Sequence, residues 1–169
     1  MLSKLPLELT KIKNLESLTL DGNLFNEIPA PVYQLKKLKY LYAKDNLIQH
    51  VPADIIALKH LSILDLSGNQ IEFVAEGIGS LQKLKVLLLQ NNKIKVIPSS
   101  LVSLKYLDIL RVHNNPLEEP FAAYGVELKM SAKEEKEKID KIFAILKSIH
   151  DELNASEHIS TKEKKSKKK

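Results

Sequence analysis

The chain contains no cysteine, and this absence excludes several kinds of chemistry at once. Without a thiol there is no disulfide framework, no thiolate metal ligand and no cysteine nucleophile. A cysteine-free protein suits a reducing compartment. We therefore expect an intracellular protein, mainly in the cytoplasm.

Long apolar runs are missing as well. The first residues, MLSKLPLELTKIK, have no uninterrupted apolar core followed by a small-residue cleavage site. No segment approaches the ~20 apolar residues that a membrane-spanning helix needs. We therefore expect a soluble chain without a signal peptide.

Motifs that carry enzymatic chemistry are also absent. Neither GxxxxGK[ST] nor GxGxxG occurs, so no phosphate-cradling loop is indicated. No nucleophile-and-base arrangement can be recognised. The histidines lie at unrelated positions, none with the spacing of a metal site: His50, His60, His113, His150 and His158. We expect no enzyme activity, no cofactor, no metal and no small-molecule substrate.

Net positive charge is confined to one end of the chain. The formal charge is +5, and residues 161–169, TKEKKSKKK, with six lysines and one glutamate, already supply it. The rest of the chain is neutral in sum. A uniformly basic surface for nucleic acid is therefore not indicated, and an electrostatic partner would be captured by the tail.

What the chain has in abundance is leucine at a fixed spacing. Five segments that begin 23 residues apart follow the pattern LxxLxLxxN: LESLTLDGN, LKYLYAKDN, LSILDLSGN, LKVLLLQNN and LDILRVHNN. Only Ala43 and Val112 replace the third leucine. The units begin at Leu15, Leu38, Leu61, Leu84 and Leu107. An apolar residue follows two positions after each asparagine, and an apolar–proline step such as Ile28-Pro29 comes next, with Ala75 in place of proline in the third unit.

This pattern resembles the leucine-rich repeat family. The resemblance implies a curved, right-handed α/β solenoid with a parallel concave β-sheet and short helical or 3-10 turns on the convex side. The 23-residue unit with its Ile-Pro step looks like the intracellular Ras-suppressor, erbin and scribble type. The resemblance to this type implies a protein partner, such as a small GTPase or another signalling protein.

The alternation within each unit agrees with this fold. Leu18, Thr19 and Leu20 have the period of a strand, and equivalent segments of stacked units pair in parallel. The asparagines lie where the chain leaves the strand, and their amides can bond to the backbone of the turn. We interpret them as structural residues.

The composition divides the chain into four parts. Residues 1–13 match the second half of a unit and form either an abbreviated cap or part of a longer repeat protein. Residues 14–120 hold the repeats, 121–154 a C-terminal cap with an amphipathic helix, and 155–169 a lysine-rich tail of low apolar content that we expect to be disordered.

The C-terminal helix has two interpretations. Ser131 and Glu134 form a capping box at its start, and Phe121, Tyr124 and Val126 are expected to cover the last coil. An apolar stripe follows: Ile139, Ile142, Phe143, Leu146, Ile149 and Leu153. We favour packing on the last repeat over a seam for a partner helix, because isolated coiled coils need about three heptads or more.

The outward positions of the concave sheet form three columns, because strand side chains alternate. These are Ser17, Tyr40, Ile63, Val86, Ile109; Thr19, Tyr42, Asp65, Leu88, Arg111; and Asp21, Lys44, Ser67, Gln90, His113. Apolar residues with two tyrosines and the single arginine have the composition of an interface. We predict that the partner binds at Tyr40, Tyr42, Ile63, Asp65, Val86, Leu88, Gln90, Ile109, Arg111 and His113.

The lysine-rich tail is a second candidate. Its lysines would serve nuclear import or contact an anionic membrane, or would simply keep the terminus soluble: Lys162, Lys164, Lys165, Lys167, Lys168 and Lys169. Nucleic acid is a weaker fit, because the tail lacks interleaved aromatics. The sequence thus predicts a non-enzymatic interaction module or signalling scaffold, with a tail-targeted element or a segment of a larger repeat protein as the alternatives. It does not indicate an oligomeric state.

Overall fold

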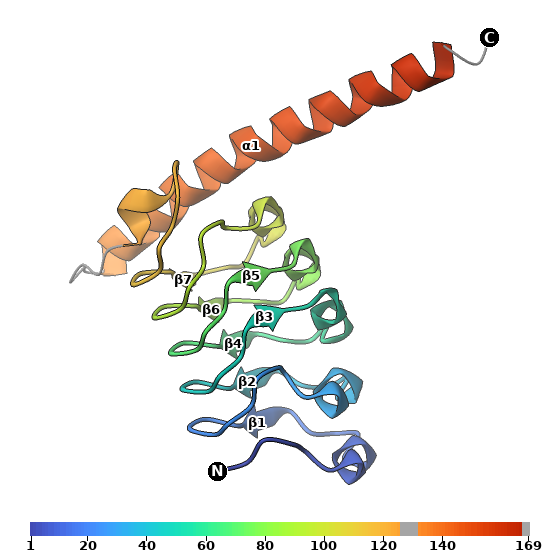
Figure 1. The fold of residues 1–169 in the computed structure, drawn as a ribbon, viewed down its shortest axis with the longest axis vertical. Helices are drawn as coiled ribbons and strands as arrows, with labels where there is room; N and C mark the ends of the chain where they lie inside the picture. Colours follow the sequence, from blue (N-terminus) through green and yellow to red (C-terminus); the bar gives the residue numbers. More distant parts are fainter. Residues whose placement is uncertain (126–131, 167–169) are drawn as a thin grey trace.

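A computed structural model describes residues 1–125 and 132–166, with residues 132 and 154–166 described by their backbone only. Its main feature is a five-stranded parallel sheet in the order β1-β2-β4-β6-β7 (Figure 1). The strands are β1 Ser17–Thr19, β2 Tyr40–Tyr42, β4 Ile63–Asp65, β6 Val86–Leu88 and β7 Ile109–Arg111. Each strand pairs with the equivalent residues of the next repeat, so the register predicted from the 23-residue spacing is confirmed.

Short 3-10 helices form the convex side of the stack. They are η1 Leu7–Lys11, η2 Ala30–Gln34, η3 Ala53–Ala57, η4 Glu76–Ser80 and η5 Ser99–Ser103. A proline stands just before four of them, and Ala75 takes the same extended conformation before η4. Between the two sides lies a short parallel pair, β3 His50–Val51 and β5 Phe73–Val74. The leucine pattern does not predict this pair.

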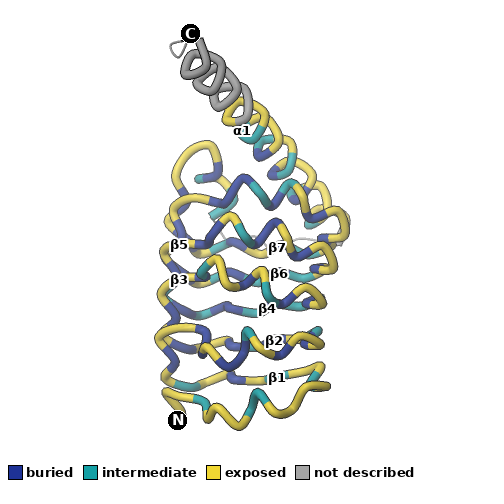
Figure 2. The backbone as a smooth tube through the Cα atoms, turned by 90° about the vertical axis from the view of Figure 1, so that its right-hand side faces the viewer, coloured by how far each residue is buried: buried dark blue, intermediate teal, exposed yellow. Residues whose placement is uncertain are grey.

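The apolar core runs through the whole stack. The leucines of successive units are almost fully buried in the middle repeats, where each coil has a neighbour on both sides, as Figure 2 shows. A unit of this length cannot cover its own apolar face, so burial depends on stacking. In the fourth unit Leu84, Leu87 and Leu89 are all buried, as are Ile94 and Ile97.

The asparagines hold the turns between repeats, as predicted. The side-chain nitrogen of Asn92 donates to the carbonyl oxygens of Leu66 and Leu89, both at 3.0 Å. Its side-chain oxygen accepts the backbone N–H of Ile71 at 2.9 Å. Asn46, Asn69 and Asn115 repeat this set of bonds. Each asparagine therefore pairs buried backbone groups that strand ladders leave unsatisfied.

The residue before each of these asparagines has a left-handed backbone. These residues are Gly22 (φ 65°), Asp45 (φ 52°), Gly68 (φ 65°), Asn91 (φ 57°) and Asn114 (φ 53°). Glycine, asparagine and aspartate tolerate this region best. The middle residue of each triplet that follows a strand is therefore glycine, aspartate or asparagine: DGN, KDN, SGN, QNN and HNN.

The N-terminal residues 1–13 form the second half of a repeat. Leu5 and Leu9 pack against the core, and η1 stacks on η2. The backbone N–H of Leu2 donates to the side-chain oxygen of Asn23 at 2.7 Å. Leu7 and Ile12 are exposed at 71% and 51%.

The helix α1 Ala132–Ser166 crosses the other end of the stack, and its C-terminal part extends beyond the repeats (Figure 1). It is preceded by η6 Ala122–Tyr124. Ile139, Ile142 and Leu146 are buried against the last repeat, where α1 contacts η5 and β7. The apolar stripe therefore packs on the repeats, as favoured above, while Leu153 at its far end is exposed.

Two of the sequence expectations concern residues at this end of the chain. The capping box at Ser131 and the contact of Val126 lie outside the described residues. The tail was predicted to be disordered from residue 155, but the backbone of 155–166 is helical, because α1 continues through these residues. Low apolar content did not end the helix, since this segment is rich in lysine and glutamate, which have high helix propensity, and contains neither glycine nor proline.

Candidate interaction surface on the concave face

The strands present alternate side chains to the core and to the concave face. Leu41, Leu64 and Leu87 at the strand centres are fully buried. The residues on either side of them point outward and align in register. The first outward column is Ser17, Tyr40, Ile63, Val86, Ile109, and the second is Thr19, Tyr42, Asp65, Leu88, Arg111. The structure thus brings together the residues of both columns that the repeat predicted to be neighbours.

The apolar members of these columns form one continuous strip across β2, β4, β6 and β7. We call it the concave strip, and it consists of Tyr40, Tyr42, Ile63, Val86, Leu88 and Ile109. Tyr40 is exposed at 37%, and the other members are half-buried. Neighbouring strands lie only ~4.8 Å apart, so these side chains shield one another. The strip is less exposed than expected, and at its C-terminal end α1 contacts β7, which carries Ile109.

The third column has a structural role in part. The Asp21 carboxylate accepts the backbone N–H of Lys44 at 2.7 Å. The Asp65 carboxylate accepts the N–H of Ser67 at 2.9 Å and its hydroxyl at 2.6 Å, and Ser67 is buried. Asp65, predicted as a partner contact, therefore also holds the turn that follows β4.

Arg111 lies at the end of the strip and pairs with α1. Its Nε and Nη2 atoms donate to the same carboxylate oxygen of Glu135, at 3.2 Å and 3.0 Å. The side chain remains 45% exposed, and His113 beside it is half-buried. Sequence reasoning missed the Glu135 contact, because nothing in the repeat pattern shows where the helix docks. Arg111 thus connects the concave face to the C-terminal helix.

Gln90 and the tail lysines complete the predicted set. Gln90 is half-buried at the margin of the strip, where its backbone oxygen accepts the N–H of Gly68 at 3.0 Å. Lys162, Lys164 and Lys165 lie in the C-terminal part of α1, with side chains that are not described, and Lys167, Lys168 and Lys169 lie outside the described residues. The tail is therefore far along the chain from the strip and is not brought to it by any described contact.

Two further properties bear on the chemistry of the molecule. Within residues 1–125 and the described side chains of α1, no cluster of three or more His, Asp or Glu has an arrangement that could hold a metal ion. None of the helices among the described residues has both the length and the apolar character to cross a bilayer.

Comparisons with known proteins identify the family of this chain. A family model described as leucine rich repeat matches residues 13–71 and again 59–117, which together cover more than half of the chain. The chain belongs to the leucine-rich repeat family. The predicted solenoid fold is thereby confirmed, whereas the 23-residue intracellular subtype is not distinguished from other repeats of the family.

Solved structures of leucine-rich repeat proteins are similar to this chain. A leucine-rich repeat protein of Leptospira interrogans is 34% identical with a TM-score of 0.67, over 72% of this chain and 31% of that one. The PEPR1–AtPEP1 complex matches at 28% identity and a TM-score of 0.62, over 71% of this chain and 18% of that one. The BIR3–SERK2 complex from Arabidopsis thaliana matches at 30% identity and a TM-score of 0.56, over 62% and 58%.

This leucine-rich repeat chain spans about a third of the Leptospira protein and less than a fifth of the matched PEPR1–AtPEP1 chain. A comparison with curated protein sequences finds no match. Domains of this family generally mediate protein–protein interaction and are typically not enzymes.

Proposed function

We propose that this leucine-rich repeat protein is a non-enzymatic interaction module that binds a protein partner on its concave face. The concave strip carries the proposal. It joins two tyrosines and four aliphatic side chains on four adjacent strands, with Arg111 at its end. Aromatic anchors surrounded by aliphatic contacts are typical of residues that dominate binding energy at interfaces.

The size of the strip limits what can bind there. The four strands that carry the strip, at ~4.8 Å spacing, extend over about 14 Å. This length suits a peptide, a loop or one face of a small domain. Two of the similar structures are themselves complexes, PEPR1–AtPEP1 and BIR3–SERK2, and they support a protein or peptide partner in general terms.

The finer proposal concerns the kind of pathway. The 23-residue repeat with its Ile-Pro step resembles scaffolds of Ras-type and polarity signalling, so a small GTPase or another signalling protein inside the cell is the partner class that the resemblance suggests. A scaffold role follows if the concave face and a second surface bind at the same time.

The test compares two pairs of alanine substitutions. Tyr42→Ala with Leu88→Ala truncates the centre of the strip, whereas Phe73→Ala with Val96→Ala removes similar apolar side chains that are 61% and 64% exposed away from the strip. Arg111 is left unchanged, because its loss would also release Glu135 on α1.

Each variant is immobilised and exposed to an extract of the cells that express the protein, and the captured proteins are identified. We expect the strip variant alone to lose specific partners. Equal capture by the strip variant and the control variant, both with native circular dichroism spectra, would refute concave-face binding.

A further inference from the structure

One flank of the solenoid is strongly basic, although the repeats have no net charge. The flank consists of the loops that lead from each 3-10 helix to the next strand, residues 12–16, 35–39, 58–62, 81–85 and 104–108. Together these loops hold eight lysines and only two acidic residues, Glu16 and Asp108. We call this surface the basic flank.

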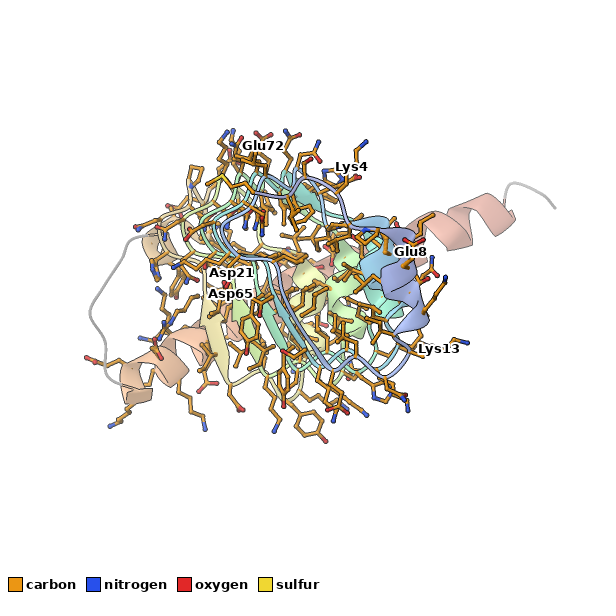
Figure 3. All side chains as sticks on the ribbon, turned by 90° about the horizontal axis from the view of Figure 1, so that it is seen from below. Lys4, Glu8, Lys13, Asp21, Asp65 and Glu72 are labelled. Carbon is orange, nitrogen blue, oxygen red and sulfur yellow. The ribbon has the colours of Figure 1, made fainter. Side chains whose placement is uncertain are left out.

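The segments that follow the strands lie on the other side of the stack, and their net charge is negative. Residues 20–29, 43–52, 66–75, 89–98 and 112–121 contain more acidic residues than lysines. Figure 3, which looks along the stack from its N-terminal end, shows Lys13 and Glu72 on opposite sides. The neutral sum of the sequence thus hides a separation of charge across the molecule.

A groove of about 400 Å³ lies on the basic flank. Its charged walls are Lys39, Lys83 and Lys85, with His60 between them, and Tyr40 and Tyr106 contribute their rings. The described residues that line it include no carboxylate. Tyr106 is 63% exposed, and Tyr40 also belongs to the concave strip, so the groove opens at the edge of that strip.

The three lysines of the groove differ in how far their charge is balanced. Lys39 is held by Glu16, with 2.8 Å between Nζ and Oε1, and this hydrogen bond raises the pKa of Lys39. Lys83 contacts His60, with 3.5 Å between Nζ and Nδ1. Among the described residues, neither Lys83 nor Lys85 forms an ion pair with a carboxylate. These two lysines leave uncompensated positive charge in a hollow.

We propose that this groove binds an acidic peptide segment of a protein partner. The carboxylates of the segment pair with Lys83 and Lys85, and an apolar side chain packs on the Tyr106 and Tyr40 rings. A groove of this size, with two tyrosine rings beside its lysines, suits a short segment that carries both carboxylates and an apolar side chain. Nucleic acid is less suitable, because the basic flank contains no arginine and the groove is short. The proposal does not depend on binding at the concave strip.

The fourth repeat provides a matched test. Lys83→Glu with Lys85→Glu reverses two charges in the groove, and Lys93→Glu with Lys95→Glu reverses two charges of the same repeat on the other flank. Both double variants have the same net charge and the same tail. All four lysines are exposed, so both variants should keep the fold. Lys83→Gln with Lys85→Gln serves in place of the reversal if the reversal alters the circular dichroism spectrum.

The probe is a fluorescent peptide of sequence EELEELEE, titrated with the full chain and followed by anisotropy, with KKLKKLKK as the control probe. We expect the groove reversal to weaken binding of the acidic probe by at least about tenfold and the control reversal by less than about twofold, since close charge pairs act locally and distant ones are screened beyond ~10 Å at 0.1 M salt. The double variant Tyr42→Ala and Leu88→Ala should bind this probe normally, which separates the groove from the concave strip.

Two outcomes would overturn the proposal. An equal loss in both charge-reversal variants would show that binding follows net charge and not the groove. Stronger binding to phosphatidylserine vesicles or to a short oligothymidylate than to the acidic peptide, lost in the groove variant only, would assign the groove to lipid or to nucleic acid instead.

Discussion

Removal of one buried asparagine should destabilise the stack far more than removal of its counterpart in the first unit. Asn92 is 7% exposed and lies between the third and fourth coils. Its side chain donates to Leu66 and Leu89 and accepts the N–H of Ile71. Asn92→Ala leaves the buried N–H of Ile71 without its partner. The carbonyls of Leu66 and Leu89 each lose one bond and keep another, from Asn69 and Asn115.

The expected cost follows from these bonds. An orphaned buried N–H costs about 1–3 kcal/mol, and each lost carbonyl bond adds about 1 kcal/mol. Asn92→Ala should therefore lower the free energy of unfolding by about 3–5 kcal/mol. Asn23 makes bonds of the same kind to Leu20, Asp21 and Leu2, but it is only half-buried. Water can replace its amide, so Asn23→Ala should cost about 1 kcal/mol.

Urea unfolding followed by circular dichroism measures both values, with equal m-values required for a valid comparison. Equal costs for Asn92→Ala and Asn23→Ala would contradict this reasoning. They would mean that burial of the asparagine hydrogen bonds does not determine how much these bonds stabilise the fold.

Two more matched pairs test the packing. Gly22 and Gly68 share φ 65°, and a Cβ at Gly22 meets nothing, whereas one at Gly68 meets the carboxylate of Asp45, whose side chain is 61% exposed and can move aside. Gly22→Ala and Gly68→Ala should therefore each cost about 1 kcal/mol in thermal unfolding, set by the left-handed backbone, and a clearly larger loss for Gly68→Ala would contradict this. Ile142 lies on the buried face of α1, and Ile142→Ala should lower the free energy of unfolding by about 2–5 kcal/mol. Leu153 is 53% exposed, so Leu153→Ala should cost less than about 1 kcal/mol. A similar loss for both variants in urea unfolding would mean that the helix does not depend on its docked face.

Much of the frame could be predicted from the sequence, because it follows from a repeated pattern. The spacing of 23 residues determined the strand register, the buried leucines and the role of the asparagines, and each was confirmed. Stacking repeats the same local environment, so one unit explains the next. The two columns on the strands were predictable for the same reason.

The rest depended on contacts that no repeat encodes. The pairing of Arg111 with Glu135 requires knowledge of where α1 docks. The basic flank was missed because net charge was summed along the chain, although the lysines of successive loops align on one side. The loop positions form columns at the same 23-residue spacing as the strand positions, and that spacing is the signal of the flank in the sequence. The partial shielding of the concave strip likewise depends on the sizes of neighbouring side chains.

The most direct measurement uses the absence of cysteine, which allows a photo-crosslinker at any single introduced thiol. Thr19→Cys places it on the concave face, Val96→Cys on the flank that follows the strands, and Ser103→Cys on the convex η5, and all three positions are exposed. If the protein partner binds the concave face, benzophenone at Thr19→Cys crosslinks it and the other two positions do not. Crosslinks to the same partner from Val96→Cys or Ser103→Cys, with none from Thr19→Cys, would contradict the concave-face account.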